Sequence, residues 1–411
     1  MPRVRILVIS DLYPPVAFGG YEMECASVVD HLRLAHDVHV LTCDRDADRA
    51  PADPTVLREL PYSSSGRGAR ALAPLHAARA VRVARRVLAA TRPELVYVWN
   101  ATAIPSAAVR VAVDAGAPVA LRLCERWYAE RLLGADHFLR FLTPGDAGLR
   151  AGWGRLMRLV NRLPGLRLEA GRPFRAAVAW NSRALRDEVQ LPAVVEPVLE
   201  RIIHPATRAG AHFASLPRRP ADVPRILFVG RVWPQKGSLV AVRALAALER
   251  GHAVGARLEL VGPCTPADRA QVEAEARAHG VAERVEISGP LGVERLGEAF
   301  QRARAFVAPS MAEAFGLACV EAALARVPVV ASRVGGIPEA LREGEHALFF
   351  APGDAEGCAA ALAEALRDGT AGTERVARAF ERASELSLDA YLAATDRFIA
   401  EAAAGLGPGA S

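Results

Sequence analysis

The sequence predicts an α/β protein built from two doubly wound parallel sheets that face a cleft. Apolar runs of strand length alternate with helical patterns along the chain, and this alternation is typical of parallel sheets with right-handed crossovers. The alternation stops at residues 205–224 and then restarts. A chain of 411 residues is also too long for one ordinary core, so we expect two domains.

The first half of the chain supplies the elements of an N-terminal domain, residues 1–204. It opens with an apolar strand at 4–10, which is followed by a loop at 11–20. The expected elements that follow are a helix at 21–34, a strand at 37–42, a helix at 69–91, a strand at 94–99, a helix at 104–115 and a strand at 118–123. Each strand precedes a helix, so the strands are expected to be parallel.

The second domain, residues 225–385, repeats the pattern after the linker at 205–224. The expected strands are 226–229, 257–261, 285–288, 305–308 and 327–331, and the helices between them are 238–250, 266–279, 293–302 and 316–325. The remaining residues, 386–411, are expected to form a last amphipathic helix with a frayed end. In such sheets the default ligand site is the crevice outside the carboxyl ends of the strands.

Composition and charge exclude several classes of function. The chain is 51% apolar and 24% charged, which is typical of a soluble globular protein. Its net charge of +5 is mild and no basic tract carries interleaved aromatic residues, so nucleic-acid binding is not expected. Six scattered cysteines without CxxC or Cys/His spacing indicate reduced thiols and no metal site. Without a signal peptide or an apolar run of about 20 residues, a cytoplasmic location is expected.

One basic segment, residues 149–175, stands apart from this composition. It carries a single glutamate and seven arginines, which are Arg150, Arg155, Arg158, Arg162, Arg167, Arg172 and Arg175. A basic amphipathic helix can lie on an anionic membrane surface, so one interpretation is a weak membrane contact. The other interpretation, which we favour, is an insert that packs beside the cleft with its arginines in water, because the apolar face is short.

Lys236 is the only lysine among 51 basic residues, the other 50 being arginine. It follows the apolar run 225–229, which ends at Gly230, and Arg231 lies between them in sequence. Lysine is a compact point charge, whereas arginine is a rigid planar fork, so a retained lysine is informative. Two cations beyond the end of a parallel strand favour a phosphate site.

A second motif occupies residues 308–354. The expected strand ends before Pro309, the loop after it carries Glu313, and a helix begins near Phe315 and Gly316. Free N–H groups at a helix start bind phosphate or a polar sugar edge. Glu321 follows on the same helix, and its carboxylate can accept hydrogen bonds from hydroxyls on a different part of the same ligand.

These stretches together resemble family 4 glycosyltransferases, the retaining enzymes of the GT-B fold, in which two Rossmann-like domains face a cleft. The matching pieces, in chain order, are Gly19 and Gly20 in the first loop, Arg231 with Lys236, Glu313 to Glu321, and Gly335 to Glu339. The match covers the C-terminal domain well and the N-terminal domain patchily. The resemblance implies a hexosyltransferase that uses a nucleotide-diphosphate sugar as co-substrate, without a cofactor or metal.

The resemblance also implies roles at the matching positions. Arg231 and Lys236 would hold the donor diphosphate, and all three of Arg231, Lys236 and Glu313 would be catalytic. Glu313 would contact hydroxyls of the donor sugar, and Glu321 would bind the ribose. The main-chain amides of Phe315, Gly316 and Leu317 would also contact the donor sugar. The tail helix would cross back onto the N-terminal domain.

The N-terminal domain would supply the remaining contacts. Gly19 and Gly20 would lie over the donor phosphate, and Asn100 and Glu125 follow expected strands on the acceptor side. Related chains often carry a histidine there; the stretch 121–127 has none. Glu125 is therefore only a candidate base, and the acceptor stays open.

The function predicted from the sequence is transfer of a sugar from a UDP- or GDP-sugar, with retention, to a small-molecule acceptor in natural-product (antibiotic) biosynthesis. Four alternatives remain: a lipid-linked acceptor at a membrane surface, a nucleotide-sugar epimerase, a phosphorylase, and a non-enzymatic scaffold that binds sugar nucleotides. The sequence does not determine the donor, the acceptor atom or the oligomeric state.

Overall fold

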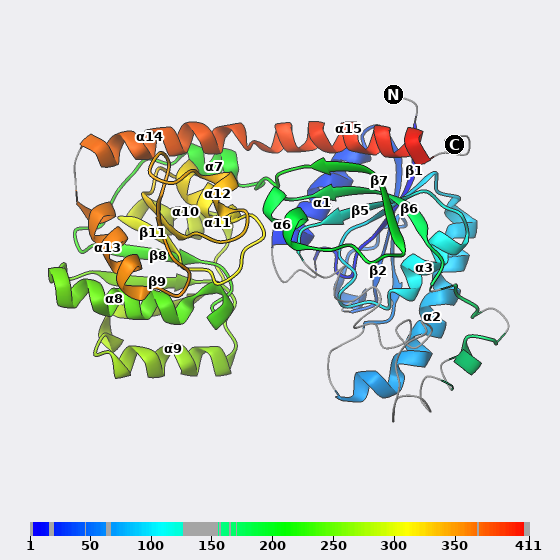
Figure 1. Ribbon diagram of the computed structural model, residues 1–411, viewed down its shortest axis with the longest axis horizontal. Helices are drawn as coiled ribbons and strands as arrows, with labels where there is room; N and C mark the ends of the chain where they lie inside the picture. Colours follow the sequence, from blue (N-terminus) through cyan, green and yellow to red (C-terminus); the bar gives the residue numbers. More distant parts are fainter. Residues whose placement is uncertain are drawn as a thin grey trace. The chain divides into compact units, whose positions relative to one another are not determined.

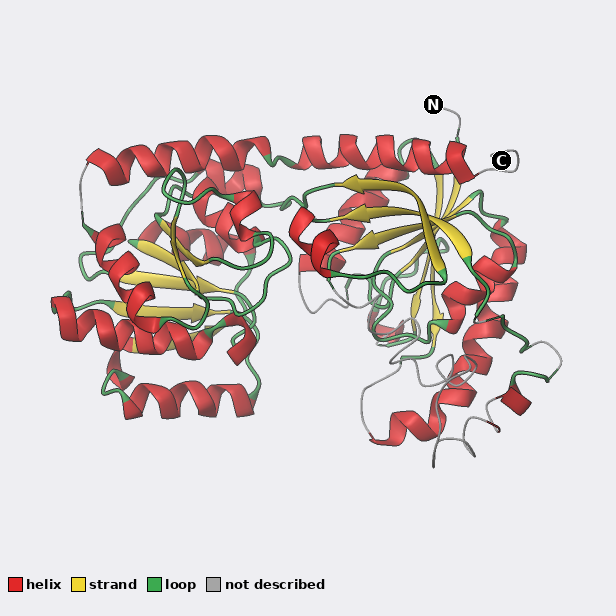
Figure 2. Ribbon diagram, in the orientation of Figure 1, coloured by secondary structure: helices red, strands yellow, loops and turns green. Residues whose placement is uncertain are grey.

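The computed structural model describes residues 3–15, 20–45, 47–62, 67–125, 155, 158–163, 166–169, 171–367 and 370–406. The chain divides into two compact units (Figure 1). Unit 1 comprises Met1–Asn181, Leu185–Ile203 and Leu392–Ser411, and unit 2 comprises Ser182–Ala184 and His204–Tyr391. Each unit holds one parallel sheet with helices around it (Figure 2).

Unit 1 contains a seven-stranded parallel sheet in the order β3-β2-β1-β4-β5-β6-β7. The strands are β1 (Arg5–Ile9), β2 (Asp37–Cys43), β3 (Val56–Leu60), β4 (Leu95–Val98), β5 (Val119–Leu123), β6 (Phe174–Trp180) and β7 (Val195–Ile202). The central strands are buried along their length, as expected for a sheet covered on both faces. The four strands predicted in this half, β1, β2, β4 and β5, are confirmed.

The helices of unit 1 include α1 (Gly20–Leu32), α2 (Arg67–Thr91), α3 (Ala107–Asp114) and most of α6 (Arg183–Glu188), with a short 3₁₀ turn, η1, at Ala47–Arg49. Helices α2 and α3 pack against the same apolar cluster as the sheet. The predictions of helices at 21–34, 69–91 and 104–115 are confirmed to within a few residues at each end.

Three strands of unit 1, β3, β6 and β7, were not predicted. Strand β7 carries Pro197 and three charged residues, and most of its side chains are exposed because it is the edge strand. Proline is tolerated at a sheet edge, where one row of backbone groups has no ladder partner. The alternating apolar pattern that identifies a buried strand is therefore missing from its sequence.

Unit 2 contains a six-stranded parallel sheet in the order β10-β9-β8-β11-β12-β13. The strands are β8 (Arg225–Val229), β9 (Arg257–Val261), β10 (Val285–Gly289), β11 (Ala305–Ala308), β12 (Val329–Ser332) and β13 (Leu348–Phe350). Five of them were predicted; β13 is three residues long, too short to show a periodicity.

The helices of unit 2 alternate with these strands. They are α7 (Gly210–Ser215), α8 (Ser238–His252), α9 (Pro266–Ala278), α10 (Val293–Arg302), α11 (Leu317–Leu324), α12 (Ile337–Ala340), α13 (Ala355–Leu366) and α14 (Thr370–Glu385), with 3₁₀ turns η4 (Pro234–Lys236) and η5 (Ala282–Arg284). Residues 205–224, expected to be a linker, contain α7 and belong to unit 2. The Phe213 ring is buried there and lies 5.2 Å from Phe300.

The last helix, α15 (Leu388–Leu406), begins in unit 2 and continues in unit 1 from Leu392. Its Phe398 is 1% exposed, and the ring lies 6.2 Å from that of Tyr97 in β4. Two polar contacts accompany this packing: Asp396 lies 2.7 Å from His31 Nε2, and Glu401 lies 2.8 Å from Arg201. Among the described helices, none is both long and apolar enough to cross a bilayer.

Candidate functional site

Three loops meet at the carboxyl edge of the unit 2 sheet, where β8, β11 and β12 end. The Met311 amide donates to the carbonyl of Gln235 at 2.9 Å, which joins the loops after β11 and β8. The Ser332 hydroxyl at the end of β12 donates to the carbonyl of Ser310 at 2.6 Å. These bonds fix the loop that carries Glu313 against the turn that carries Lys236.

Lys236 and Glu313 form an ion pair at this edge. The Nζ atom of Lys236 lies 2.6 Å from Oε2 of Glu313, although 77 positions separate the two residues. The side chains are 32% and 18% exposed, so the pair is partly desolvated yet still open to a ligand. The Ser310 hydroxyl donates to the same oxygen of Glu313 at 3.4 Å. The pair places a cation and a carboxylate where a phosphate and a sugar hydroxyl could bind.

Two glycines make the close approach of these loops possible. Gly237, next to Lys236, has φ +79°, and a Cβ added there would lie 1.8 Å from the carbonyl oxygen of Pro309. Gly335 has φ +51°, and its added Cβ would lie 1.6 Å from the carbonyl oxygen of Glu313. Only glycine avoids both the backbone strain and the clash at such positions.

The amino end of α11 faces the same edge. Gly316 precedes the helix with φ +93°, and no side chain caps the helix start. The first amides of a helix have no intrahelical acceptor, so those near Leu317 are suited to bind an anion. Phe315 is 2% exposed, and its ring stacks on His204 at 4.9 Å. Its side chain therefore anchors the turn, while the backbone can serve a ligand.

Glu321 lies further along α11, and the pKa of its carboxyl is raised. Burial raises the pKa of its carboxyl to about 7, and a hydrogen bond with the Thr207 side chain opposes this rise. A carboxyl with this pKa changes charge near neutral pH, so its hydrogen bonding to a ligand hydroxyl would change with pH. Thr207 was not identified from the sequence, because it lies within the segment expected to be a linker.

Arg231 lies on the loop after β8 but contacts neither Lys236 nor Glu313 in the described contacts. Its guanidinium carbon lies 4.7 Å from the ring centre of Trp233, a cation–π contact, and the side chain is exposed. The structure thus brings Lys236 and Glu313 together, whereas Arg231, on the same loop as Lys236, is exposed to solvent.

A further polar group, Glu339, was among the matching pieces in the sequence but had no role assigned to it. Glu339, at the end of the Gly-Gly motif, accepts hydrogen bonds from the amides of Arg183 at 2.9 Å and Ala184 at 2.7 Å. His204 Nε2 lies 3.3 Å from the same carboxylate. Burial lowers the pKa of His204, and the hydrogen bond to Glu339 opposes this effect. Glu339 therefore holds two stretches at the start of unit 2, rather than a ligand.

The acceptor-side candidates lie in unit 1, after β4 and β5. The amide nitrogen of Asn100 donates to Oε1 of Glu125 at 3.2 Å; Asn100 is 8% exposed, and Glu125 is exposed. Nearby, Asp11 accepts from the Thr102 hydroxyl at 2.7 Å, and burial raises its pKa. The structure therefore brings together the two residues that the sequence placed at the ends of neighbouring strands.

Of the two glycines expected over the donor phosphate, Gly19 lies outside the described residues. Gly20 is the first residue of α1, and no other described residue beyond its chain neighbours and its own helix backbone has an atom within 4 Å of a Cβ added to it.

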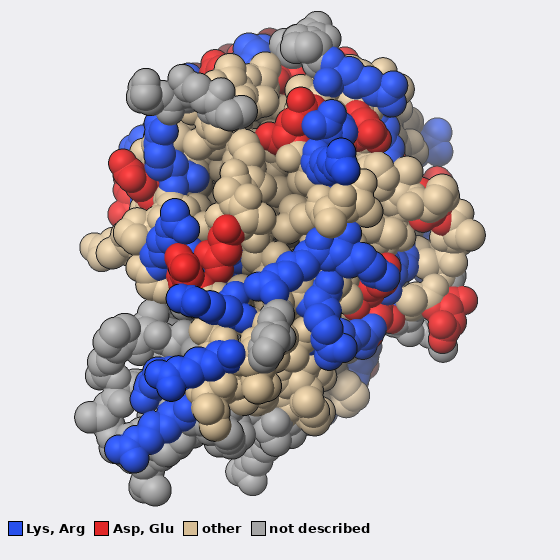
Figure 3. Space-filling view, turned by 90° about the vertical axis from the view of Figure 1, so that its right-hand side faces the viewer, with Lys and Arg blue, Asp and Glu red and all other residues tan. Residues whose placement is uncertain are grey.

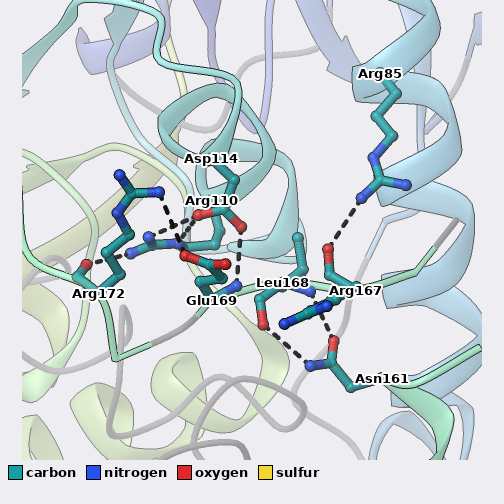
Figure 4. Close-up of polar contacts among 8 residues, drawn as sticks. All are labelled: Arg85, Arg110, Asp114, Asn161, Arg167, Leu168, Glu169 and Arg172. Carbon is teal, nitrogen blue, oxygen red and sulfur yellow. Dashed lines mark hydrogen bonds and ion pairs between the residues drawn. The ribbon is translucent and has the colours of Figure 1, made fainter.

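Much of the basic segment 149–175 also lies outside the described residues, but its last part is held against unit 1. The Asn161 side chain bonds to the main chain of Leu168 in both directions at 3.0 Å, and Arg85 donates to the carbonyl of Arg167 (Figure 4). Arg110 donates to the carbonyl of Arg172 at 2.8 Å and pairs with Asp114 (Figure 4).

The described arginines of this segment are exposed; they are Arg155, Arg158, Arg162, Arg167, Arg172 and Arg175. Long basic side chains lie side by side on one face of the molecule (Figure 3). The described part of the segment thus agrees with an insert that packs on its domain and keeps its arginines in water.

Comparisons with known proteins agree with the fold, and the matched ranges include the stretch that holds Lys236 and Glu313. A family model described as "Glycosyl transferases group 1" matches residues 223–368. The chain is 32% identical to glycogen synthase of Mycobacterium tuberculosis over 243 residues, 58% of this chain and 56% of that protein. It is 38% identical to D-inositol 3-phosphate glycosyltransferase of Actinosynnema mirum over 187 residues, 42% of this chain and 45% of that protein. The chain thus spans about half the length of these curated relatives.

The fold is shared over almost the whole chain. The structure of HepE from Anabaena in complex with UDP and glucose superposes with a TM-score of 0.65 at 18% identity, covering 97% of this chain and 99% of that one. The two parallel α/β sheets and this likeness confirm the GT-B fold predicted from the sequence. The chain has the GT-B fold, and its residues 223–368, which hold Lys236 and Glu313, match the model of the group 1 glycosyltransferases.

Proposed function

We propose that the protein is a retaining glycosyltransferase that moves a sugar from a nucleotide-diphosphate sugar to a small-molecule acceptor. The observation that carries this proposal is the ion pair of Lys236 and Glu313 at the carboxyl edge of the unit 2 sheet. The pair lies within the stretch that matches the family model, next to the uncapped start of α11.

The site offers positive charge where a leaving diphosphate would develop negative charge. Lys236 supplies a point charge, the exposed Arg231 supplies a planar fork, and the amides at the start of α11 supply oriented dipoles. Groups of this kind, fixed before the reaction, stabilise the transition state without reorganisation. Since two side-chain cations provide the charge, we propose that transfer proceeds without a metal ion.

In the proposed reaction, the bond between the sugar anomeric carbon and the diphosphate oxygen breaks, and a bond from the same carbon to the acceptor hydroxyl forms. The acceptor proton passes to the leaving diphosphate if attack occurs on the front face, or to Glu125 if that carboxylate acts as base. Front-face attack retains the anomeric configuration. Glu313 positions the sugar through its hydroxyls, and Glu321 holds the ribose.

The relatives favour a UDP-sugar as the first donor to test. HepE was solved with UDP and glucose. The curated relatives are named for different acceptors, glycogen and D-inositol 3-phosphate. We therefore propose that unit 1 determines the acceptor, near Asn100 and Glu125, and that the acceptor is a natural-product intermediate carrying a free hydroxyl.

The single lysine provides a direct test of the donor site. An amine-directed reagent can modify only Lys236 and the N-terminal amine, so mass spectrometry reports on one side chain. We expect a bound UDP- or GDP-sugar to protect Lys236 and to raise the melting temperature, because a ligand that binds only the folded state stabilises it. Equal labelling of Lys236 with and without every nucleotide sugar, and no thermal shift, would reject the proposed site.

The stereochemistry and the metal requirement have tests of their own. We expect NMR spectra of the product to show the anomeric configuration of the donor, and we expect the rate to be unchanged by EDTA. An inverted product would contradict retention, and a rate abolished by EDTA and restored by Mg²⁺ would contradict metal independence.

A lipid-linked acceptor is the second candidate, and the exposed arginines of the described part of segment 149–175 favour it. Co-sedimentation with vesicles containing anionic lipid separates the two candidates. Binding that salt weakens supports a membrane-bound acceptor, whereas no binding to such vesicles favours an acceptor in solution.

A further inference from the structure

Unit 2 also has a concave site at the amino edge of its sheet, away from Lys236 and Glu313. A cavity of about 340 Å³ opens there, within the range of about 300–1,000 Å³ usual for small-molecule pockets. Its lining includes Arg304, which directly precedes β11, and the first residues of β12 and β13, Val329 and Leu348. Glu313 and Lys236 follow the opposite ends of β11 and β8, so the length of a strand separates the two sites.

The lining of this cavity is strongly basic. Five arginines contribute to it from five separate stretches of unit 2: Arg218, Arg304, Arg326, Arg367 and Arg375. Among the described residues that line it, none is aspartate or glutamate. Like charges gathered in one concave surface repel one another, and such a surface attracts anions.

Most of these arginines are held by neutral groups, which leave their charge uncompensated. Arg218 donates to the carbonyls of Phe300 and Ala303, each at 2.6 Å, and Arg304 donates to the carbonyl of Ala221 at 3.1 Å. In the same way Arg326 donates to a carbonyl at 2.8 Å, and its guanidinium carbon lies 3.7 Å from an aromatic ring centre. These contacts fix the guanidinium groups without neutralising them.

Arg375 is the exception, since it pairs with Glu364 at 2.7 Å. Its side chain is only 16% exposed, and its Nε atom is enclosed without a hydrogen-bond acceptor among the described residues. A buried donor of this kind costs free energy unless a partner satisfies it. Arg367 at the end of α13 is exposed and lines the same cavity.

Burial among these arginines also lowers the pKa of Arg218. Burial, together with the neighbouring charge of Arg304, lowers the pKa of Arg218 to about 10. A nearby anion would stabilise the charged form of such a group. The cavity therefore combines fixed cations, an unsatisfied buried donor and no lining carboxylate among the described residues.

We propose that this cavity binds a small phosphorylated molecule, at a site separate from that of the nucleotide sugar. A phosphate group carries about −1.5 to −2 charges at neutral pH, more than a single carboxylate, and it accepts paired hydrogen bonds from guanidinium forks. The volume accommodates a phosphorylated metabolite of the size of a hexose monophosphate. The inference rests on the cavity alone and does not require the proposed function to be correct.

Calorimetric titration of the full chain with inorganic phosphate and with a hexose monophosphate tests the proposal. The variants are Arg367→Gln and Arg375→Gln. The matched control is Arg277→Gln, which makes the same charge change at an exposed position of α9 outside the cavity. Since a hydrogen bond to a charged group contributes about 1.5–3 kcal/mol, we expect each cavity variant to weaken binding about tenfold or more, and the control to bind like the wild type.

Lys236→Ala separates the two phosphate sites. We expect it to bind the hexose monophosphate as the wild type does, whatever its effect on nucleotide sugars. Arg367 is exposed and no contact of its side chain is described, so Arg367→Gln stays informative even if Arg375→Gln weakens the packing of α14. The proposal is overturned if neither probe binds, or if binding disappears in Lys236→Ala and persists in both cavity variants. Equal affinity for the two probes would identify free phosphate as the ligand.

Discussion

The ammonium group of Lys236 lies 2.6 Å from the Glu313 carboxylate, and this contact joins the turn after β8 to the loop after β11. Because Lys236 also faces the proposed diphosphate, Lys236→Ala should lower kcat by about 10²–10³-fold, as loss of one charge-stabilising donor does elsewhere. Lys236→Arg should not restore the rate, since a planar fork replaces a point charge. Sugar transfer under saturating donor measures both effects.

The control for that experiment is Arg277→Ala, an exposed cation on α9 outside the candidate site. Circular dichroism should show all the variants folded. A folded Lys236→Ala protein that transfers sugar at the wild-type rate would contradict the assignment of the donor site.

Gly237→Ala should destabilise unit 2 more than Gly280→Ala. Both glycines have positive φ, +79° and +70°, so each alanine pays a similar backbone cost of about 1 kcal/mol. Only at Gly237 does the new Cβ meet the Pro309 carbonyl oxygen, at 1.8 Å; at Gly280, apart from its chain neighbours, no atom of the described part of the chain lies within 4 Å of the new Cβ. The extra loss in the free energy of unfolding, from urea titration, should reach about 1–3 kcal/mol. Equal losses in the two variants would show that the loops do not approach this closely.

Glu321→Gln should gain stability relative to the wild type as pH rises. The folded carboxyl has a pKa of about 7 and the unfolded one about 4.5, so the folded protein binds more protons between these values. Wild-type stability from this group therefore falls from about pH 4.5 and levels off above pH 7, by at most about 3 kcal/mol. Melting temperatures at pH 5 and pH 8 measure the difference. Glu381→Gln, at an exposed position, should show the same change in melting temperature between pH 5 and pH 8 as the wild type. If Glu321→Gln also shows the wild-type change, the prediction is wrong.

Arg122→Met should destabilise unit 1 by about 3–5 kcal/mol, because it leaves a buried carboxylate without its partner. The side chains of Arg122 and Glu24 are 1% and 4% exposed and lie 2.9 Å apart. The matched control is Arg250→Met, which breaks an exposed pair with Glu356 and should cost at most about 1 kcal/mol. Adding Glu24→Gln to Arg122→Met should recover part of the loss, as chemical unfolding would show. Similar losses from the buried and the exposed pair would refute the expected role of burial.

Strands could be predicted from the sequence where burial requires a run of apolar residues. Strands β8, β9 and β11 are short apolar runs between helices, and their positions could be predicted. Strand β7 could not, because an edge strand with Pro197 and exposed charges lacks that pattern. Lys236 and Glu313 could be assigned to one site because both follow strand ends, yet their direct contact depends on β8 and β11 being neighbours in the sheet.

The arginine-lined cavity shows the limit of such predictions. Its five arginines come from stretches between positions 218 and 375, and nothing distinguishes them in sequence from the other 45 arginines of the chain. Only the fold shows that strand starts and helix ends bring them together. Thr207 was missed for a related reason, since the segment 205–224, which looks like a linker in sequence, is part of unit 2.

Helix α15 has a consequence for the order in which the units are completed during synthesis. Domains generally fold as their residues leave the ribosome, the N-terminal one first. Unit 1 differs, because Phe398 packs on Tyr97 and is made after all of unit 2. Until residues 392–406 emerge, the apolar face of the nascent unit 1 around Tyr97 lacks its contact with α15. Unit 2 can therefore finish folding before unit 1, and chains that stop within α14 would leave this apolar face open to chaperones.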